Sequence, residues 1–273
     1  MTAETATSAS PNVHVRDLFS LKDRVALVTG GAGQYGRQIS QALAEAGATV
    51  IVASRNYEKC AEFAEELSSQ GHEADALPLD LLDEESVSEV AGEIQSRYRK
   101  LDVLFNNAVM VKAEPLEDHS DEDWARAVGQ NSLALYRACR VFGALMAKRS
   151  AGSIVNIASI YGVVSPDFRI YEGHEEMTNP PSYGFVKAGM IQLTRYLAVY
   201  FAPHGVRVNC ISPGGLFSPS MPAPFVEKYA ARTPLARMAG PSDLKGAAVF
   251  LACDASAYVT GQNLIVDGGY TAW

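Results

Sequence analysis

The chain has few cysteines, no excess of basic charge and no long apolar run. Its cysteines lie far apart, with no CxxC pair and no histidine at metal-ligand spacing, so neither a disulfide framework nor a metal site is predicted. The formal net charge of -8 argues against non-specific binding to nucleic acid or an anionic membrane. Every apolar run falls short of the roughly 20 residues that a membrane helix requires. We expect free, buried thiols in a reducing compartment at Cys60, Cys139, Cys210 and Cys253.

The first twenty residues are poor in basic and apolar side chains. They are rich in Ala, Ser and Thr and carry Glu4, so they lack the basic start and apolar centre of a secretory signal. We expect a flexible N-terminal arm over residues 1–20 and a cytoplasmic location. No linker or internal repeat divides the rest, so residues 21–273 are expected to form a single domain.

From Arg24 onward, short apolar segments rich in Val, Ile and Leu alternate with longer segments of helical periodicity. This alternation is typical of βαβ units and a parallel sheet. The strand candidates are nearly continuous apolar runs, as expected where helices cover both faces of a sheet. They are residues 25–29, 49–53, 73–79, 103–106, 153–158, 207–211 and 263–266. Seven such strands predict an α/β fold, a Rossmann-type doubly wound parallel sheet in one domain.

The segments between the strands contain helices and two irregular stretches. Helices are expected at residues 37–46, 58–70, 84–98, 121–148, 182–201 and 243–253. Asp83, Ser120 and Ser182 stand where N-caps are favoured. Residues 164–181 and 212–241 are rich in Pro, Gly and charge. Because long irregular loops in a compact domain are often functional, we expect them to be substrate loops.

A glycine-rich segment, residues 29–36, joins the first strand to the first helix. In this context glycines let the backbone approach a pyrophosphate, and the helix N-terminus offers its N–H groups to the negative charge. A GxGxxG pattern alone is weak evidence, but here it opens a βαβ unit. The segment predicts a dinucleotide site that includes Gly30, Gly33, Gln34, Tyr35 and Gly36.

The end of the second strand bears on the choice of nucleotide. An acid about 20 residues after such a glycine segment holds the ribose 2′-hydroxyl in NAD sites, but this strand ends in Ser54-Arg55-Asn56. The guanidinium of Arg55 suits a 2′-phosphate, with Ser54 as an added donor. We therefore expect NADP(H) to be favoured, with NAD(H) as the other candidate. The alternative is that Arg55 is a solvated surface charge.

Three residues around the fifth strand form a candidate catalytic group. Ser159 follows the strand, and Tyr183 and Lys187 lie near the start of the next helix. Four residues along a helix put Tyr183 and Lys187 on one face, so the cation is expected to lower the phenol pKa from about 10. Ser159 is placed to hydrogen-bond a substrate oxygen while Tyr183 exchanges a proton and hydride moves to or from a nicotinamide.

From Arg24 to Gly269 the chain resembles the short-chain dehydrogenases/reductases. The ordered matches are the glycine-rich segment, Asp80-Leu81, Asn106-Asn107-Ala108, Asn131, Ser159, Tyr183, Lys187, Pro213-Gly214 with Leu216 and Ser218, and Asp267-Gly268-Gly269. So many elements in the family's order exclude a chance match. The resemblance implies the fold described above and an oxidoreductase that acts on a carbonyl/alcohol pair.

The resemblance also implies roles for these residues. Asp80 and Leu81 would lie near the adenine ring, and Asn107 and Ala108 beside the cofactor. The segment with Pro213, Gly214, Leu216 and Ser218 would hold the carboxamide. Lys187 would contact the nicotinamide ribose, and Asn131 would anchor a water that relays protons from Lys187. On its own, Asn131 is interpreted as a helix residue that faces solvent or bonds locally.

The chain departs from the family pattern at three places. Gln34 replaces a glycine of the usual TGxxxGxG pattern, which leaves the TGxxGxxG spacing of the extended branch of the family. Val109 stands where a glycine commonly follows Ala108. Between Ser159 and Tyr183 lie 23 residues, about twice the number usual in the family. This insertion is expected either to contact substrate or to be a solvated surface bulge.

The expected function is hydride transfer between NADP(H) or NAD(H) and a secondary alcohol/ketone pair. A sugar, sugar acid or polyol is expected as substrate, because the two loops offer several polar partners. Their candidate substrate contacts are Arg169, Glu172, His174, Phe217 and Met221. The alternatives are an extended-type sugar epimerase or lyase and a non-catalytic nucleotide-sensing regulator. The helices at 121–148 and 182–201 carry surplus apolar surface, so a homodimer or homotetramer is expected.

Overall fold

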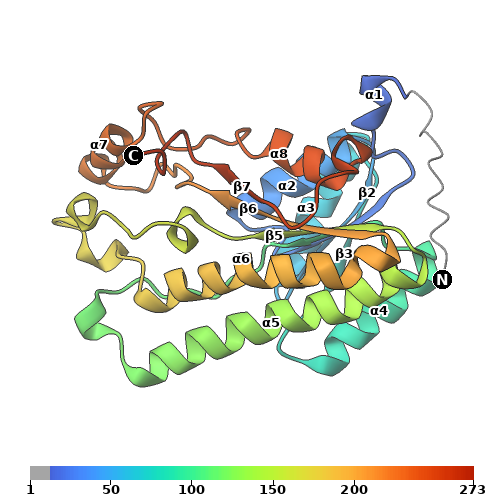
Figure 1. The fold of residues 1–273 in the computed structure, drawn as a ribbon, viewed down its shortest axis with the longest axis horizontal. Coiled ribbons are helices and arrows are strands. Elements are labelled where there is room, and N and C mark those ends of the chain that lie inside the picture. Colours follow the sequence, from blue (N-terminus) through green and yellow to red (C-terminus); the bar gives the residue numbers. More distant parts are fainter. Residues whose placement is uncertain (1–12) are drawn as a thin grey trace, which may run out of the picture.

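A computed structural model describes residues 13–273 of the chain. Seven strands form one parallel sheet in the order β3-β2-β1-β4-β5-β6-β7, which confirms the predicted doubly wound, Rossmann-type fold. The chain winds from β1 out to β3, returns to the centre at β4 and continues to β7 at the other edge (Figure 1). The strands are β1 Val25–Thr29, β2 Thr49–Ser54, β3 Ala74–Pro78, β4 Val103–Asn106, β5 Gly152–Ile157, β6 Val206–Pro213 and β7 Asn263–Val266.

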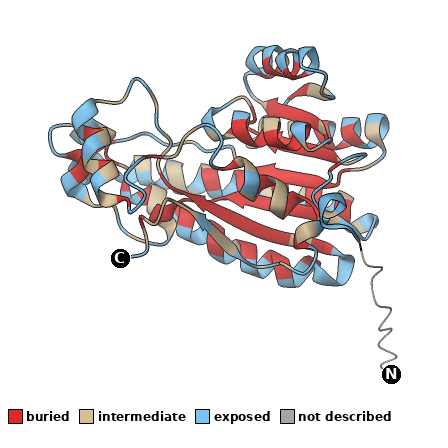
Figure 2. Ribbon diagram, turned by 90° about the horizontal axis from the view of Figure 1, so that it is seen from above, coloured by how far each residue is buried: buried red, intermediate tan, exposed pale blue. Residues whose placement is uncertain are grey.

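Helices cover both faces of the sheet. One face packs against α2 Gln34–Glu45, α3 Tyr57–Ser69 and α8 Lys245–Ala252, and the other against α4 Glu84–Tyr98, α5 Asp121–Lys148 and α6 Pro181–Phe201. Successive residues of β1 alternate between the two cores, with Ala26 and Val28 in the first and Val25 and Leu27 in the second. Figure 2 shows the buried strands between helices whose outer sides are exposed. Burial on both faces explains why the strands are continuous apolar runs.

The winding of the sheet reverses between β1 and β4. β1 pairs with β2 on one side and with β4 on the other, and Thr29 and Asn106 are in register at the carboxyl ends of β1 and β4. Ligands of doubly wound sheets bind in the crevice at this reversal. The fold therefore brings the glycine-rich segment and the residues after β4 to the same edge.

Three helices begin earlier than the sequence predicts, and α3 does so by one residue, at Tyr57. α2 begins at Gln34, inside the glycine-rich segment, because Gly33 takes an extended conformation as its N-cap. α6 begins at Pro181, with Pro180 as N-cap, because proline at the first helical position has a suitable φ and no N–H to satisfy. The prediction that Ser182 caps α6 is therefore wrong, and its hydroxyl is buried in the first turn.

Two other predicted caps are confirmed. The Asp83 carboxylate accepts a hydrogen bond from the Glu85 N–H at 2.9 Å, and the Ser120 hydroxyl accepts one from the Asp123 N–H at 3.1 Å. Each bond satisfies a backbone donor that the helix itself cannot satisfy. They fix the starts of α4 and α5.

The two stretches expected to be irregular contain short helical elements. Segment 164–181 holds the 3-10 turns η3 Phe168–Tyr171 and η4 Glu175–Met177, and segment 212–241 holds a helix that was not predicted, α7 Ala223–Arg232. Both segments lie at one end of the molecule, beyond the carboxyl ends of the strands (Figure 1). They share a third apolar core of Ile160, Tyr161, Ile170, Tyr171, Phe225, Tyr229, Met238 and Tyr270.

The predicted N-terminal arm, residues 1–20, lies partly outside the described residues. Its described part contains one helical turn, α1 Val15–Leu18. The centre of the Phe19 ring lies 6.5 Å from that of the Phe250 ring on α8. The end of the arm therefore contacts the domain.

Within residues 13–273, no helix has the length and apolar character needed to cross a membrane. The same residues bring no three His, Cys, Asp or Glu side chains together as metal ligands. All four cysteines are buried free thiols, as predicted.

Candidate active site

The glycine-rich segment forms a cradle at the start of α2. Gly30 has a φ of +62°, in the left-handed region that glycine adopts freely. A Cβ atom at Gly36 would overlap the carbonyl oxygen of Gly30, so only glycine fits at this crossing. The N-cap, Gly33, has no side chain to satisfy the first N–H groups of α2, and the first turn has no acid. These N–H groups suit an anion such as a pyrophosphate.

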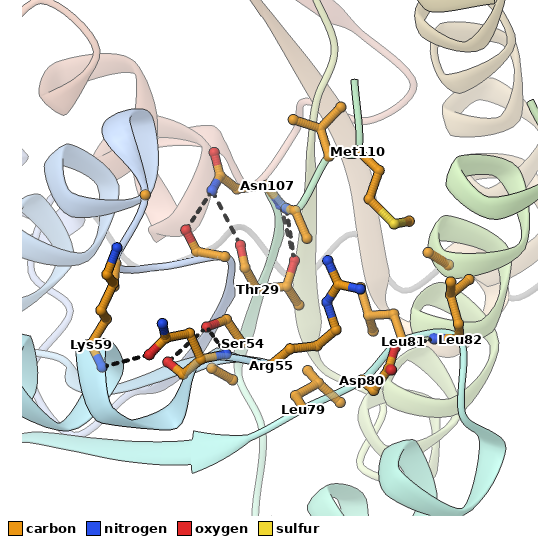
Figure 3. Close-up of a pocket in the computed structure, with 18 of the residues that line it drawn as sticks. Thr29, Ser54, Arg55, Lys59, Leu79, Asp80, Leu81, Leu82, Asn107 and Met110 are labelled. Carbon is orange, nitrogen blue, oxygen red and sulfur yellow. Dashed lines mark hydrogen bonds between the residues drawn. The ribbon is translucent and has the colours of Figure 1, made fainter. Parts of the chain in front are cut away.

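Asn107 fastens the cradle to the end of β4. Its side-chain amide donates to the carbonyl oxygens of Thr29 at 3.2 Å and Gly30 at 2.9 Å (Figure 3). The backbone N–H groups of Asn107 and Ala108 donate to the Thr29 hydroxyl at 3.1 and 3.2 Å. A cavity of about 460 Å³ opens beside the cradle, a size suited to a small-molecule ligand. It is lined by the predicted residues Gly30, Gly33, Gln34, Tyr35, Ser54, Arg55, Asp80, Leu81, Asn107 and Ala108.

The residues that follow β2 lie beside this cavity. The Ser54 hydroxyl is bonded within its own turn, donating to the Asn56 carbonyl at 3.1 Å with the Cys60 sulfur also at 3.1 Å. The expectation that Ser54 donates to a 2′-phosphate is therefore not supported. Arg55 extends into the cavity, as Figure 3 shows, and the exposed Lys59, which was not predicted, also lines it. Within residues 13–273 neither cation has an ion-pair partner.

β5 and α6 bring the three predicted catalytic side chains together. Ser159 directly follows β5 and is buried, and its Oγ accepts a hydrogen bond from the Tyr161 N–H at 3.1 Å. Tyr183 lies in the first turn of α6, and Lys187 lies one turn later with 3% of its surface exposed. The Lys187 ammonium is 5.6 Å from the centre of the Tyr183 ring and donates to the Ile157 carbonyl at 2.6 Å.

Burial decides the protonation of Tyr183 and Lys187. It raises the pKa of Tyr183 above the usual value, and Tyr171 adds to this, although a hydrogen bond with Ser159 opposes it. Burial lowers the pKa of Lys187 to about 8. Lys187 was expected to lower the pKa of Tyr183, but the pKa is raised, with burial as the largest cause. At neutral pH Tyr183 is a protonated phenol.

Asn131 fixes the segment that follows β4. Its side-chain amide donates to the carbonyl oxygens of Met110 at 2.7 Å and Ala127 at 2.8 Å, and its Oδ1 accepts from the Met110 N–H at 2.9 Å. The side chain therefore bonds within α5 and also across to Met110. The water relay that the family implies stays a prediction. Val109 does not have a positive φ, so the residue that replaces the family's glycine adds no backbone strain.

The predicted carboxamide turn begins where β6 ends. Pro213 is the last residue of the strand, and Gly214 after it is buried. Leu216 forms an isolated bridge to residue 239, and the Ser218 hydroxyl is bonded within the segment. The Tyr35 hydroxyl, from the cradle, donates to the Gly214 carbonyl at 2.6 Å. Two predicted cofactor segments that are far apart in the sequence are thereby joined.

The three charged residues that were predicted to contact substrate are engaged elsewhere. The Arg169 side chain is 81% exposed, and its guanidinium pairs with Asp167 at 2.6 Å. Glu172 pairs with Lys228 of α7 at 3.3 Å, and His174 lies 3.9 Å from another glutamate of the insertion. None of the three lines the cavity beside the cradle or the one beside Tyr183. The expectation that these charges face the substrate is therefore not supported.

The insertion is packed rather than a solvated bulge. Tyr171 is 3% exposed, and its hydroxyl lies 3.0 Å from that of Tyr161, two residues after Ser159. Of the two predicted apolar contacts, Met221 packs against the third core, as Tyr183 does, whereas Phe217 is 48% exposed. Apolar and phenolic side chains therefore surround the catalytic group on this side.

A second cavity, of about 380 Å³, borders Tyr183 and Asn131 and was not predicted. One of its walls is the segment between β4 and α5, where Glu114 is buried. The Glu114 carboxylate lies 2.5 Å from the Lys112 ammonium and 2.6 Å from Nδ1 of His119. The only sign of this cavity in the sequence is the cluster of ionisable residues after the fourth strand. It was overlooked because the cluster forms no recognisable motif.

Comparison with known proteins agrees with this geometry. The family described as enoyl-(acyl carrier protein) reductase matches residues 32–271. Galactitol 2-dehydrogenase of Rhizobium johnstonii is 33% identical over 261 residues, 93% of this chain and 98% of the relative. Cyclopentanol dehydrogenase of Comamonas testosteroni is 34% identical over 259 residues, 92% of this chain and 98% of the relative.

A solved structure extends the comparison to the fold. The gluconate 5-dehydrogenase of Burkholderia cenocepacia, in complex with NADP and tartrate, matches with a TM-score of 0.86 and 30% identity. The match covers 95% of this chain and 100% of that protein. The chain belongs to the short-chain dehydrogenase/reductase family and is an oxidoreductase of that family.

Proposed function

We propose that this chain is an NADP(H)-preferring enzyme that interconverts a secondary alcohol and a ketone. The observation that carries the cofactor choice is the pair Arg55 and Lys59, two cations beside the cradle cavity without an ion-pair partner within residues 13–273. No acid ends β2 to hold a ribose 2′-hydroxyl. A 2′-phosphate supplies the anion that these cations lack. The relative that binds NADP supports this choice.

Each catalytic side chain then has one task. The nicotinamide, when bound, supplies or accepts the hydride. In reduction Tyr183 gives its phenolic proton to the substrate oxygen, and in oxidation it takes that proton back. Ser159 hydrogen-bonds the same oxygen and orients it. Lys187, held by the Ile157 carbonyl, keeps its other N–H groups for the ribose contact that the family implies.

We also propose a polyhydroxylated substrate, namely a sugar, a sugar acid or a polyol. Two relatives are named for galactitol and gluconate, which are of this kind, and one for cyclopentanol, which is not. The cavity beside Tyr183 is lined by polar side chains that include Lys112, Glu114, Gln130 and Ser182, and several hydroxyls need several such partners.

The test of the substrate class is a panel read at the nicotinamide absorbance with both cofactors. It contains sugars, sugar acids, polyols, cyclic ketones and hydroxysteroids. We expect the highest kcat/KM among the polyhydroxylated compounds. A clear preference for hydrophobic ketones would contradict the proposed class and leave the oxidoreductase assignment intact.

Replacing Arg55 tests the cofactor preference. Arg55→Ala should raise the Kd for NADPH by about 10- to 100-fold, because it removes a charge-assisted contact to the 2′-phosphate, and leave the Kd for NADH nearly unchanged. Fluorescence titration of both cofactors measures this. Arg16→Ala, which removes an exposed arginine of α1, is the control and should change neither value. Tighter binding of NADH than NADPH by the wild type would refute the proposal.

We propose that a second copy covers the exposed apolar faces of α5 and α6. These faces carry Leu133, Tyr136, Tyr196, Val199 and Tyr200, with 42–78% of each residue exposed. Neighbouring apolar side chains of this size are typical of an interface. A pair of identical helix faces favours symmetric association into a dimer or a tetramer.

Sedimentation tests this assembly. The wild type should sediment as a dimer or tetramer at micromolar concentration. Val199→Glu should raise the dissociation constant by ~100-fold, because the interface would bury an unpaired carboxylate. Tyr258→Glu, at a fully exposed turn, serves as the control with the same introduced charge. A monomeric wild type would end the proposal.

A further inference from the structure

Two tyrosine hydroxyls hold the same dipeptide, Gly214–Gly215, from opposite sides. The Tyr35 hydroxyl donates to the Gly214 carbonyl at 2.6 Å. The Tyr229 hydroxyl accepts from the Gly215 N–H, also at 2.6 Å. Tyr35 lies in the first turn of α2, within the cradle, and Tyr229 lies on α7. The dipeptide is thus tied both to the cradle, at the start of α2, and to α7.

The two remaining backbone groups of the dipeptide are also paired. The Gly214 N–H donates to the Val266 carbonyl at 2.9 Å, and the Gly215 carbonyl accepts from the Ala239 N–H at 2.9 Å. All four polar groups of the dipeptide therefore have one defined partner each. Loss of either hydroxyl would leave a backbone group without its partner, and the turn would no longer have a single preferred orientation.

The packing shows that the dipeptide is fitted to Tyr229. A Cβ atom at Gly215 would lie 3.0 Å from Cζ of Tyr229 and 2.9 Å from the methyl carbon of Met238. A Cβ atom at Gly214 would lie 3.1 Å from Cα of Asp267. A side chain at either position would therefore force Tyr229, Met238 or the Asp267 backbone to shift.

We infer that Tyr35 is a positioning residue for the nicotinamide half of the cofactor, acting with Tyr229 through the orientation of the Gly214–Gly215 turn. The inference rests on the proposed function only in that the cofactor is a nicotinamide dinucleotide. Tyr35 acts from the cradle on the turn that the family uses for the carboxamide. A residue at the pyrophosphate end of the site thereby controls the geometry at the other end.

Both hydroxyls keep their protons over the working range of pH. Burial is the largest cause that raises the pKa of Tyr35, and burial also raises the pKa of Tyr229. Tyr35 therefore stays a donor to Gly214 in acid and in mildly alkaline solution. The effect of removing its hydroxyl should be independent of pH, unlike that of removing the hydroxyl of Tyr183.

The experiment compares the whole cofactor with its adenosine half. Tyr35→Phe should raise the Kd for NADP⁺ by about 5-fold and leave the Kd for 2′-phospho-ADP-ribose, which lacks the nicotinamide, unchanged. Tyr229→Phe should change the ratio of the two constants in the same direction. If the wild type prefers NAD⁺, the same two constants are measured for NAD⁺ and ADP-ribose. The test of Tyr35 therefore does not depend on the proposed preference for NADP(H).

The control is Tyr98→Phe on α4. Its hydroxyl also makes a 2.6 Å bond, to Asp75, and it lies outside the cofactor cavity. It should alter neither constant. If Tyr35→Phe leaves both constants unchanged, or raises both by the same factor, Tyr35 is not a positioning residue for the nicotinamide. An equal rise would show that the hydroxyl only supports the cradle.

Discussion

Tyr183→Phe should lower kcat by about 10²- to 10⁴-fold, because it removes the group that exchanges a proton with the substrate oxygen. The ring stays in place, so cofactor affinity should be retained and the loss should appear in kcat rather than in binding. Steady-state rates together with cofactor titration separate the two. Tyr258→Phe, at an exposed position, is the matched control. Turnover close to that of the wild type would end the proposed mechanism.

The pH dependence of the wild type follows from the raised pKa of Tyr183. Reduction needs the protonated phenol, which predominates below that pKa. Titration of Tyr183 should therefore cause no change in the rate of ketone reduction through neutral pH. Oxidation needs the phenolate, whose fraction grows about tenfold per pH unit below the pKa. Alcohol oxidation should therefore rise with pH through the neutral and mildly alkaline range. In Tyr183→Phe this rise should disappear from the residual activity.

Gly36→Ala should raise the Kd for the cofactor by about 10- to 100-fold, the cost of misplacing a few phosphate-binding N–H groups. The added methyl would overlap the Gly30 carbonyl oxygen and lie 2.9 Å from Nδ2 of Asn107, so the cradle must shift and its bond to Asn107 must lengthen. Calorimetry with the preferred cofactor measures the loss. A lower thermal midpoint should accompany it.

The control for this substitution is Gly92→Ala on α4, where nothing lies within 4 Å of the added methyl. Alanine exceeds glycine in helix propensity by about 1 kcal/mol, so this variant should be neutral or slightly more stable. The same chemical change thus has opposite expected effects at the two sites. Unaltered cofactor affinity in Gly36→Ala would show that the crossing of α2 and the glycine-rich segment can relax without cost.

The sheet and its cofactor edge could be predicted from the sequence, because their signals are local. Continuous apolar runs gave the strands, and the glycines at residues 29–36 gave the cradle. α7 was missed because Pro222 and Pro224 suggested an irregular loop, whereas the structure uses Pro222 as the N-cap and has Pro224 in the first turn, where proline is tolerated. The predicted start of α2 was too late because the first turn of this helix lies within the glycine pattern itself.

The catalytic group was predicted by spacing, but its surroundings were not. Spacing cannot show whether a charge is paired, and Arg169 and Glu172 are paired with Asp167 and Lys228. Nor can it show burial, which sets the direction of the Tyr183 pKa. Lys59 was missed because it lies outside the motif that contains Arg55, although the first turn of α3 places it at the same cavity.

The contacts between the insertion and α7 bear on how these two segments can change in evolution. The Tyr171 and Phe225 ring centres lie 5.5 Å apart, Glu172 pairs with Lys228, and the Asp167 carboxylate lies 3.8 Å from the guanidinium of Arg232. A substitution in either segment therefore meets a partner in the other, so the two are expected to covary in evolution. Transplanting residues 164–181 into a relative without residues 223–232 would expose the insertion's apolar side, so we expect the two segments to be exchanged only together.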